Sequence, residues 1–256
     1  MLTIITHIPS PALQRCELTF VESESIDFAK AVQEHKEYCN TLKTLGARVI
    51  TLRDNRPLPD CAFVEDPIIV FDEVAVLASM GVASRRKELP LLERFFSGYR
   101  TVERIQLPAK IEGGDVLKIG RNIFVGQSAR TNKEGIQALA AIIEPLGYEV
   151  IPVRVDGCLH LKTGCTALDR ETILINSEWV DDAPFADYRK IETLPQEQFG
   201  ANVLPVLDCI CMNSAAPETS ELVRSMGYEV VPVNISEFTK AEAGLTCMSV
   251  PFDDNP

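Results

Sequence analysis

The sequence predicts an α/β fold built as a five-bladed, pseudo-symmetric ββαβ propeller. Two recurring patterns lead to this prediction. One is a helix-like segment that ends at a glycine and runs into an alternating strand, and the other is a pair of strands joined by a polar turn. The two patterns alternate with a period of roughly 45 to 50 residues, which is typical of repeat architectures.

The helix-and-strand pattern is clearest in three segments. They are "YCNTLKTLGARVITL" (38–52), "LAAIIEPLGYEVIPV" (139–153) and "SELVRSMGYEVVPV" (220–233). Gly46, Gly147 and Gly227 lie where the C-terminus of a helix favours left-handed backbone. A looser copy spans 91–105, and a degenerate one surrounds 186–194.

The strand-pair pattern lies between the helical segments. It occupies 66–78, 114–127 and 160–176, with 201–213 as a fourth member, and the turns carry Asp, Gly and Asn. A doubly wound α/β sheet also alternates strands and helices and is the alternative. We favour a radial arrangement with the helices outside, because strand pairs rather than single strands separate the helices. No linker-like stretch interrupts the repeat, so we expect a single catalytic domain over 1–256.

The composition excludes several classes of protein. The chain is 46% hydrophobic and has a formal net charge of −12, which argues against a nucleic-acid partner. It contains no run of about 18 apolar residues, so we expect no membrane partner. The first ten residues lack a basic region and a long apolar region, and we therefore expect a cytoplasmic protein.

Eight cysteines are spread along the chain, at 16, 39, 61, 158, 165, 209, 211 and 247. A chain of this size does not need disulfides, and the expected cytoplasmic setting keeps thiols reduced. There is no Cys-x-x-Cys pair and there are only three histidines, which argues against a structural metal site. We predict that six or seven of the thiols fill the core.

Polar residues recur at one position of the repeat, immediately before or at the start of a predicted strand. They are Asp60, Glu65 and Asp66, then Glu112, Gly113, Gly114 and Asp115, then His160, and finally Cys247. If rotation relates the units, these positions lie at the same end of the axis and converge on one pocket. A thiol, an imidazole and carboxylates in a cleft indicate a catalytic site.

Each of these residues also has an ordinary structural interpretation. His160 lies between Leu159 and Leu161 and could be a core histidine, and Cys247 in "GLTCMSV" has the apolar neighbours of a packing thiol. The matching positions of the whole set favour function.

These motifs resemble those of the dimethylarginine dimethylaminohydrolases. The similar segments are "PDCAFVED", "EGGDV", "VGQSARTN", "LHLK" and "GLTCMSV", and the resemblance extends over nearly the whole chain. The family belongs to the guanidino-group-modifying superfamily, whose pentein-like fold is a five-bladed α/β propeller. The resemblance implies hydrolysis of N-omega-methylated L-arginines to citrulline and an amine. It also implies a covalent cysteine intermediate, no cofactor or metal, a methylated arginine as small-molecule partner, and a homodimer.

The resemblance also implies roles for ten residues. Cys247 is the nucleophile, His160 the general acid and base, and Glu112 the carboxylate that orients His160. The substrate-binding residues are Leu18, Asp60, Glu65, Asp66, Arg85, Arg130 and Ala241. Arg85 and Arg130 correspond to residues that hold the α-carboxylate, whereas the neighbouring Arg86 is expected at the surface.

Alternatives from other classes remain at this point. Arginine deiminases carry a second carboxylate two residues after the histidine, where this chain has Lys162, and they are longer. A deiminase or amidinotransferase activity, or a non-catalytic protein that binds cationic amino acids, stays open. The cysteine pattern argues against a redox or metal-sensing thiol protein.

Overall fold

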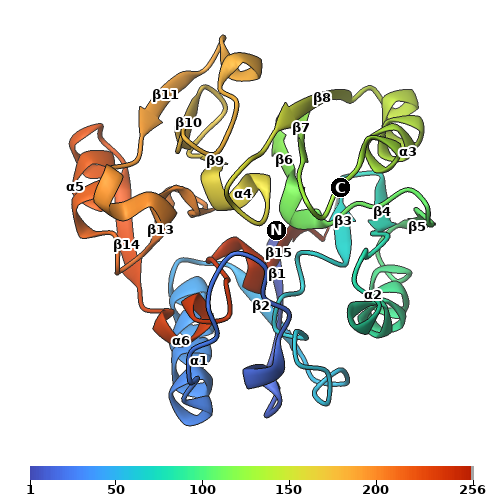
Figure 1. The fold of residues 1–256 in the computed structure, drawn as a ribbon, viewed down its shortest axis with the longest axis horizontal. Helices are drawn as coiled ribbons and strands as arrows, with labels where there is room; N and C mark the ends of the chain where they lie inside the picture. The colour runs from blue at the N-terminus through green and yellow to red at the C-terminus, as the bar shows by residue number, and fades with distance from the viewer. Residues whose placement is uncertain (255–256) are drawn as a thin grey trace.

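Fifteen strands form five three-stranded sheets around a central axis in residues 1–254, the part of the chain that the computed structural model describes (Figure 1). Four sheets are contiguous in sequence: β3 (Ile68–Val70), β4 (Val74–Leu77) and β5 (Thr101–Arg104); β6 (Val116–Ile119), β7 (Asn122–Gln127) and β8 (Glu149–Arg154); β9 (Cys165–Ala167), β10 (Thr172–Ile175) and β11 (Arg189–Glu192); β12 (Leu204–Val206), β13 (Cys209–Asn213) and β14 (Glu229–Val233). In each, the first two strands are antiparallel and the last two parallel. The predicted five-bladed propeller is therefore confirmed, and the doubly wound alternative is wrong.

The fifth sheet joins the two ends of the chain. It consists of β15 (Val250–Asp253), β1 (Leu2–His7) and β2 (Arg48–Leu52). The last strand pairs antiparallel with the first, with Leu2 opposite Asp253 and Ile5 opposite Val250. This pairing completes the ring and places the segment that contains Cys247 beside the first strand.

Four helices follow the second strands and lie at the rim of the ring (Figure 1). They are α1 (Phe28–Thr44), α2 (Leu89–Phe96), α3 (Lys133–Ile143) and α5 (Pro217–Ser225). In the β9–β11 sheet the short 3-10 helix η5 (Ala183–Phe185) replaces the helix, consistent with the degenerate repeat there. The other short helices are η1 (Leu13–Arg15), η2 (Ser84–Glu88), η3 (Gly113–Asp115), η4 (Glu144–Leu146), α4 (Leu161–Gly164), η6 (Pro195–Ala201), α6 (Ser236–Thr239) and η7 (Thr246–Met248).

Local capping explains where the longer helices begin and end. The side chains of Asp27 and Asn132 accept hydrogen bonds from the backbone N–H three residues on, which starts α1 and α3. Gly46, Gly147 and Gly227 have φ values of 100°, 86° and 97°. The prediction of left-handed glycines after these helices is confirmed, and they turn the chain into the next strand.

The first strand of each sheet lines the axis, but the predicted site residues precede these strands. His160 lies immediately before α4, the helix closest to the axis in Figure 1, and Cys247 lies in η7. The expectation that both residues begin a strand is wrong. Both residues lie instead at short helical turns that precede the first strands of their sheets.

Fewer cysteines are buried than the six or seven predicted. All eight lie in residues 1–254 and are free, and five of them are buried. Within the same residues no helix combines the length and the apolar character that a bilayer crossing requires.

Candidate active site

His160 lines the pocket and is paired with Glu112. Both side chains are buried, and His160 Nε2 lies 2.9 Å from Glu112 Oε2. Burial alone would lower the pKa of His160. The carboxylates of Asp66, Asp115 and Glu112 outweigh this effect and raise the pKa to about 9. The imidazole is therefore positively charged at neutral pH and can donate a proton.

Asp115 and Gly114 fix the place of His160. Asp115 Oδ1 accepts a hydrogen bond of 2.8 Å from the Leu161 N–H, and its Oδ2 accepts from the hydroxyls of Ser128 and Thr131. A Cβ atom on Gly114 would lie 2.5 Å from His160 Nδ1, closer than real Cβ contacts allow. The "EGGDV" segment therefore supplies one carboxylate that touches the imidazole, one that holds its backbone, and the space for the ring.

Cys247 is held in a short turn close to this pair. Its Sγ accepts a hydrogen bond of 3.4 Å from the Gly244 N–H. The amide of Asn202 fixes the turn by accepting from the Thr246 N–H and donating to the Thr246 hydroxyl. Burial raises the pKa of the Cys247 thiol, and the carboxylates of Asp66 and Glu65 raise it further. Without a bound cation the sulfur is thus a protonated thiol at neutral pH.

Asp66 presents one unpartnered oxygen to the pocket. Its Oδ2 accepts a short hydrogen bond from Arg85, whereas Oδ1 is buried and has no hydrogen-bond partner among the described residues. Oδ1 lies 3.9 Å from His160 Nδ1. Burial would raise the pKa of Asp66, but Arg85 and His160 outweigh it and lower the pKa below its ordinary value. A buried, ionised and unpartnered oxygen is a receptor for a cationic donor.

Arg85 is a buried residue of the pocket and not a surface cation. Its guanidinium donates to both carboxylate oxygens of Glu88, at 3.1 and 2.9 Å, and to Asp66. Arg86 is exposed and donates to the carbonyls of Met80 and Gly81. The two neighbouring arginines therefore differ in the way expected from the resemblance.

Arg130, Asp60 and Ala241 border the mouth of the pocket and are all buried. Arg130 lies 3.5 Å from Glu112 Oε1 and donates to the Thr19 hydroxyl at 2.9 Å. Asp60 accepts a hydrogen bond of 3.1 Å from the Glu17 N–H.

The segment around Glu17 and Thr19 closes the mouth. Glu242 accepts from the N–H groups of Thr19 and Phe20 at 2.7 and 2.9 Å. The remaining cavity has a volume of about 20 Å³, enough for one water molecule. The pocket is therefore closed in this structure.

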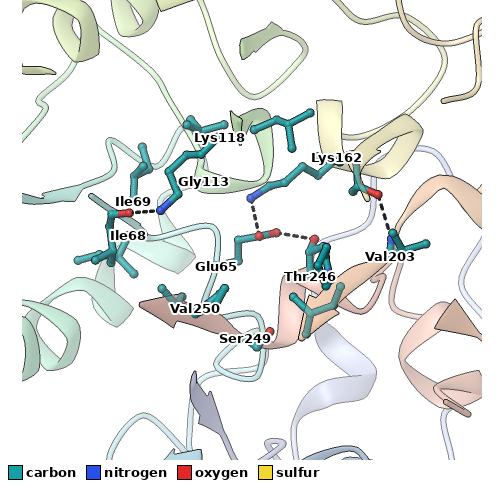
Figure 2. Close-up of a pocket in the computed structure, with 18 residues that line it drawn as sticks. Glu65, Ile68, Ile69, Gly113, Lys118, Lys162, Val203, Thr246, Ser249 and Val250 are labelled. Atoms are coloured by element: carbon teal, nitrogen blue, oxygen red, sulfur yellow. Dashed lines mark hydrogen bonds and ion pairs between the residues drawn. The ribbon is translucent and has the colours of Figure 1, made fainter. Parts of the chain in front are cut away.

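Three of the predicted site residues do not line this pocket: Glu112, Glu65 and Leu18. Glu112 is buried and contacts the site through its hydrogen bond to His160. The carboxylate of Glu65 lies in the central cavity of the ring and contacts Lys162 and the Thr246 hydroxyl (Figure 2). Leu18 is half-buried in the segment that closes the mouth, between Glu17 and Thr19. Glu65 contacts the site through its backbone, because its N–H donates to the carbonyl of Cys247 at 3.2 Å.

Three of the site residues could also ligate a metal ion. Ligand atoms of Asp66, Glu112 and His160 all lie within 4.8 Å of one another. The same anionic surroundings suit an organic cation, and the absence of a metal requirement remains a prediction.

Comparison with known proteins identifies the family. Residues 15–252 match the family model described as N,N dimethylarginine dimethylhydrolase, eukaryotic. The chain belongs to the dimethylarginine dimethylaminohydrolase family.

Relatives in this family agree along the length of the chain. The dimethylarginine dimethylaminohydrolase of Pseudomonas aeruginosa is 36% identical over 230 residues, covering 88% of this chain and 90% of the relative. That of Streptomyces coelicolor is 37% identical over 243 residues, covering 94% and 93%. A structure of the Pseudomonas aeruginosa enzyme, a cysteine-to-serine variant complexed with citrulline, superposes with a TM-score of 0.94 at 34% identity and covers 98% of this chain and 100% of the other.

Four residues that the structure places around the pocket have no individual role among those that the resemblance implies. They are Glu88, Asp115, Asn202 and Glu242. The position of Asp115 in the "EGGDV" motif, three residues after Glu112, could have indicated its role. Glu88 lies three residues after Arg85, a spacing at which helical side chains contact each other. Asn202 and Glu242 act across long sequence separations. Glu242 also has a φ of 59°, a left-handed conformation that no sequence pattern indicated.

Proposed function

We propose that this chain hydrolyses N-omega-methylated L-arginines, asymmetric dimethylarginine and monomethylarginine, to L-citrulline and dimethylamine or methylamine. The observation that carries the proposal is the unpartnered Asp66 Oδ1, which lies beside the His160–Glu112 pair in a pocket that also contains Cys247. Such an arrangement combines a receptor for a cation with a nucleophile and a proton donor.

In this proposal the acidic residues bind the guanidinium and the basic residues bind the other end of the substrate. Asp66 and Glu112 accept hydrogen bonds from the guanidinium nitrogens. Arg130 and Arg85 orient the α-carboxylate, and Arg85 also keeps Asp66 ionised. Asp60, the backbones of Leu18 and Ala241, and Glu65 complete the substrate-binding set, with Glu65 acting through the Cys247 turn.

The chemical steps follow from the residue types. The Cys247 thiolate attacks the guanidinium carbon and forms a C–S bond. His160 gives its proton to the methylated nitrogen, and the C–N bond breaks to release the amine. A thiouronium remains on the enzyme. The neutral His160 then takes a proton from a water molecule, whose oxygen attacks the carbon. The C–S bond breaks, citrulline forms and the thiolate is restored.

Substrate binding also prepares the nucleophile. In the empty pocket, burial and nearby carboxylates keep the Cys247 thiol protonated. A bound guanidinium brings a positive charge next to the sulfur and offsets Asp66, which favours the thiolate, and the thiol proton is released to bulk water. Catalysis then begins only when a cation fills the pocket.

The neighbourhood of Lys162 favours a methylated substrate over arginine. Lys162 stands where the deiminases have a second carboxylate, and its ammonium is bound to Glu65 in the central cavity. One edge of the guanidinium is therefore left without a charged partner, which accommodates methyl groups.

The test is product analysis together with trapping of the intermediate. Purified protein is incubated with asymmetric dimethylarginine or arginine, and citrulline is measured. Acid-quenched reactions are digested and searched for a mass increase on the Cys247 peptide. We expect faster turnover of the methylated substrate and an adduct on Cys247 alone. Faster turnover of arginine would support a deiminase, and citrulline formation by Cys247→Ala would exclude the covalent route.

The proposal also includes a homodimer located in the cytoplasm. Light scattering of the purified chain tests the dimer, and cell fractionation tests the location.

A further inference from the structure

A second hollow lies outside the ring, between α1 and the segment that follows β2. Its volume is about 600 Å³, within the ordinary range of small-molecule sites. We call it the α1 groove, and its lining residues come from 8–9, 28–43 and 51–56. None of them lines the pocket that contains Cys247.

Four cations line the α1 groove. Lys36 and Lys43 project from α1, and Arg53 and Arg56 come from the segment after β2. All four are exposed, and none makes an ion pair with a described residue, in contrast to the buried Arg85 and Arg130. This concentration of positive charge is unusual for a chain with a net charge of −12.

The carboxylates next to the groove cations in sequence make no ion pair with them. Asp54 is paired with Arg94 at 2.8 Å, and Glu37 accepts a hydrogen bond from Gln33 at 2.6 Å. No carboxylate of residues 1–254 contributes to the lining. The four cations therefore lack the anionic partners that the protein supplies to most of its buried cations.

The remaining wall of the groove is uncharged. Phe28 and the exposed Val32 lie on the α1 side. His35 is buried, and burial lowers its pKa to about 4, so its ring is neutral at physiological pH. Its ring nitrogens lie 3.8 Å from the Cys39 sulfur, and burial raises the pKa of that thiol. The groove thus combines cations with an apolar wall.

We propose that the α1 groove is a binding site for a small phosphorylated molecule that carries a planar ring, such as a nucleotide. Phosphate oxygens match the lysine and arginine donors, and the face of Phe28 and Val32 suits a ring. A long polyanion fits less well, because the charges that extend beyond the groove meet a chain with a net charge of −12. This site is independent of the function proposed for Cys247.

Isothermal titration calorimetry of the full chain with metal-free ATP at low salt tests the proposal. We expect saturable binding that weakens as salt increases. The variant Lys36→Gln/Arg53→Gln removes one cation from each side of the groove, and we expect its affinity for ATP to fall about tenfold. The matched control Lys133→Gln/Arg170→Gln removes the same charge from exposed positions outside the groove and should change the affinity less than about twofold.

Further titrations separate this site from its alternatives. Saturating citrulline should leave ATP binding unchanged, whereas competition would place ATP in the Cys247 pocket and overturn the proposal. Pyrophosphate should bind more weakly than ATP, and equal affinities would contradict the contribution of the apolar wall. Absence of ATP binding, an equal loss in the control variant, or tighter binding of a short oligonucleotide would each overturn the proposal.

Discussion

Glu65 and Asp66 are adjacent in sequence, yet their carboxylates serve opposite sides of the molecule. Glu65 faces the central cavity, where Lys162 and the Thr246 hydroxyl satisfy both of its oxygens (Figure 2). Asp66 lines the pocket that contains Cys247, and its Oδ1 has no hydrogen-bond partner in residues 1–254. Burial raises the pKa of Glu65 despite its lysine, whereas Arg85 and His160 lower that of Asp66.

This difference indicates that the Glu65 carboxylate has a structural role, whereas the Asp66 carboxylate is available to bind a ligand. A carboxylate whose oxygens are both hydrogen-bonded stabilises the fold, because its removal would leave a buried cation without a counter-charge. An ionised oxygen that is buried without a partner costs stability unless a ligand satisfies it. The sequence motif cannot make this distinction, because Glu65 and Asp66 are adjacent residues that both carry a carboxylate.

The substitution Asp66→Asn is the strongest test of the difference between Glu65 and Asp66. It removes the charge that faces the guanidinium and leaves Arg85 with Glu88, so we expect kcat/KM to fall about a thousandfold, equivalent to about 4 kcal/mol. Steady-state kinetics with asymmetric dimethylarginine measures this effect. The exposed Asp72→Asn is the control, and a loss below tenfold for Asp66→Asn would contradict the proposed role.

Glu112→Gln tests the proton donor on the pocket side. His160 must be protonated to release the amine, and its raised pKa of about 9 keeps it so until the pH rises through that value. Glu112 is one cause of the raised pKa, so in the variant the falling limb of the kcat/KM profile should move to lower pH. We also expect about a hundredfold loss at the optimum. An unchanged falling limb would show that another group controls it.

Glu65→Gln should affect stability more than catalysis. The change leaves the Lys162 ammonium facing a neutral amide, and we expect the free energy of unfolding in urea to fall by about 1–3 kcal/mol. The kcat/KM should fall no more than about tenfold, because the side chain lies outside the pocket. The double variant Glu65→Gln/Lys162→Met should recover part of the stability. A catalytic loss equal to that of Asp66→Asn would remove the contrast.

Of the four substitutions, we expect Glu242→Gln to have the smallest effect, which is more frequent opening of the segment that closes the pocket mouth. One of the two charge-assisted hydrogen bonds from the Thr19 and Phe20 N–H groups becomes neutral and the other is lost, because the amide nitrogen of Gln cannot accept. We expect hydrogen exchange of these two amides to accelerate about five- to tenfold at unchanged global stability. The amides of β7 serve as the internal control, and acceleration there as well would indicate general destabilisation.

The sequence predicted the ring because each unit repeats the same local signals. Gly46, Gly147 and Gly227 end their helices as expected, and strand pairs separate these helices. The ordered motifs likewise predicted that His160, Glu112, Asp66 and Cys247 lie near one another. Helical periodicity and turn chemistry depend on neighbours in the chain, so they are visible in sequence.

The remaining features depend on contacts between distant residues. The direction of the Glu65 side chain is set by Lys162 and Thr246, which lie far from it in the chain. The turns that hold His160 and Cys247 were expected to be strands, because apolar neighbours suit either element. The closure of the mouth by Glu242 uses a left-handed residue and hydrogen bonds across more than 220 positions.

The pairing of β15 with β1 has a consequence for the order of folding. The blade that carries Cys247 joins residues at opposite ends of the chain, so its last strand can dock only after the other blades have been synthesised. Such non-local pairing forms late and slowly. A nascent chain could therefore assemble the carboxylates, the imidazole and the arginines while its reactive sulfur was still unplaced. Full reactivity would arise in one step, when the ring closes.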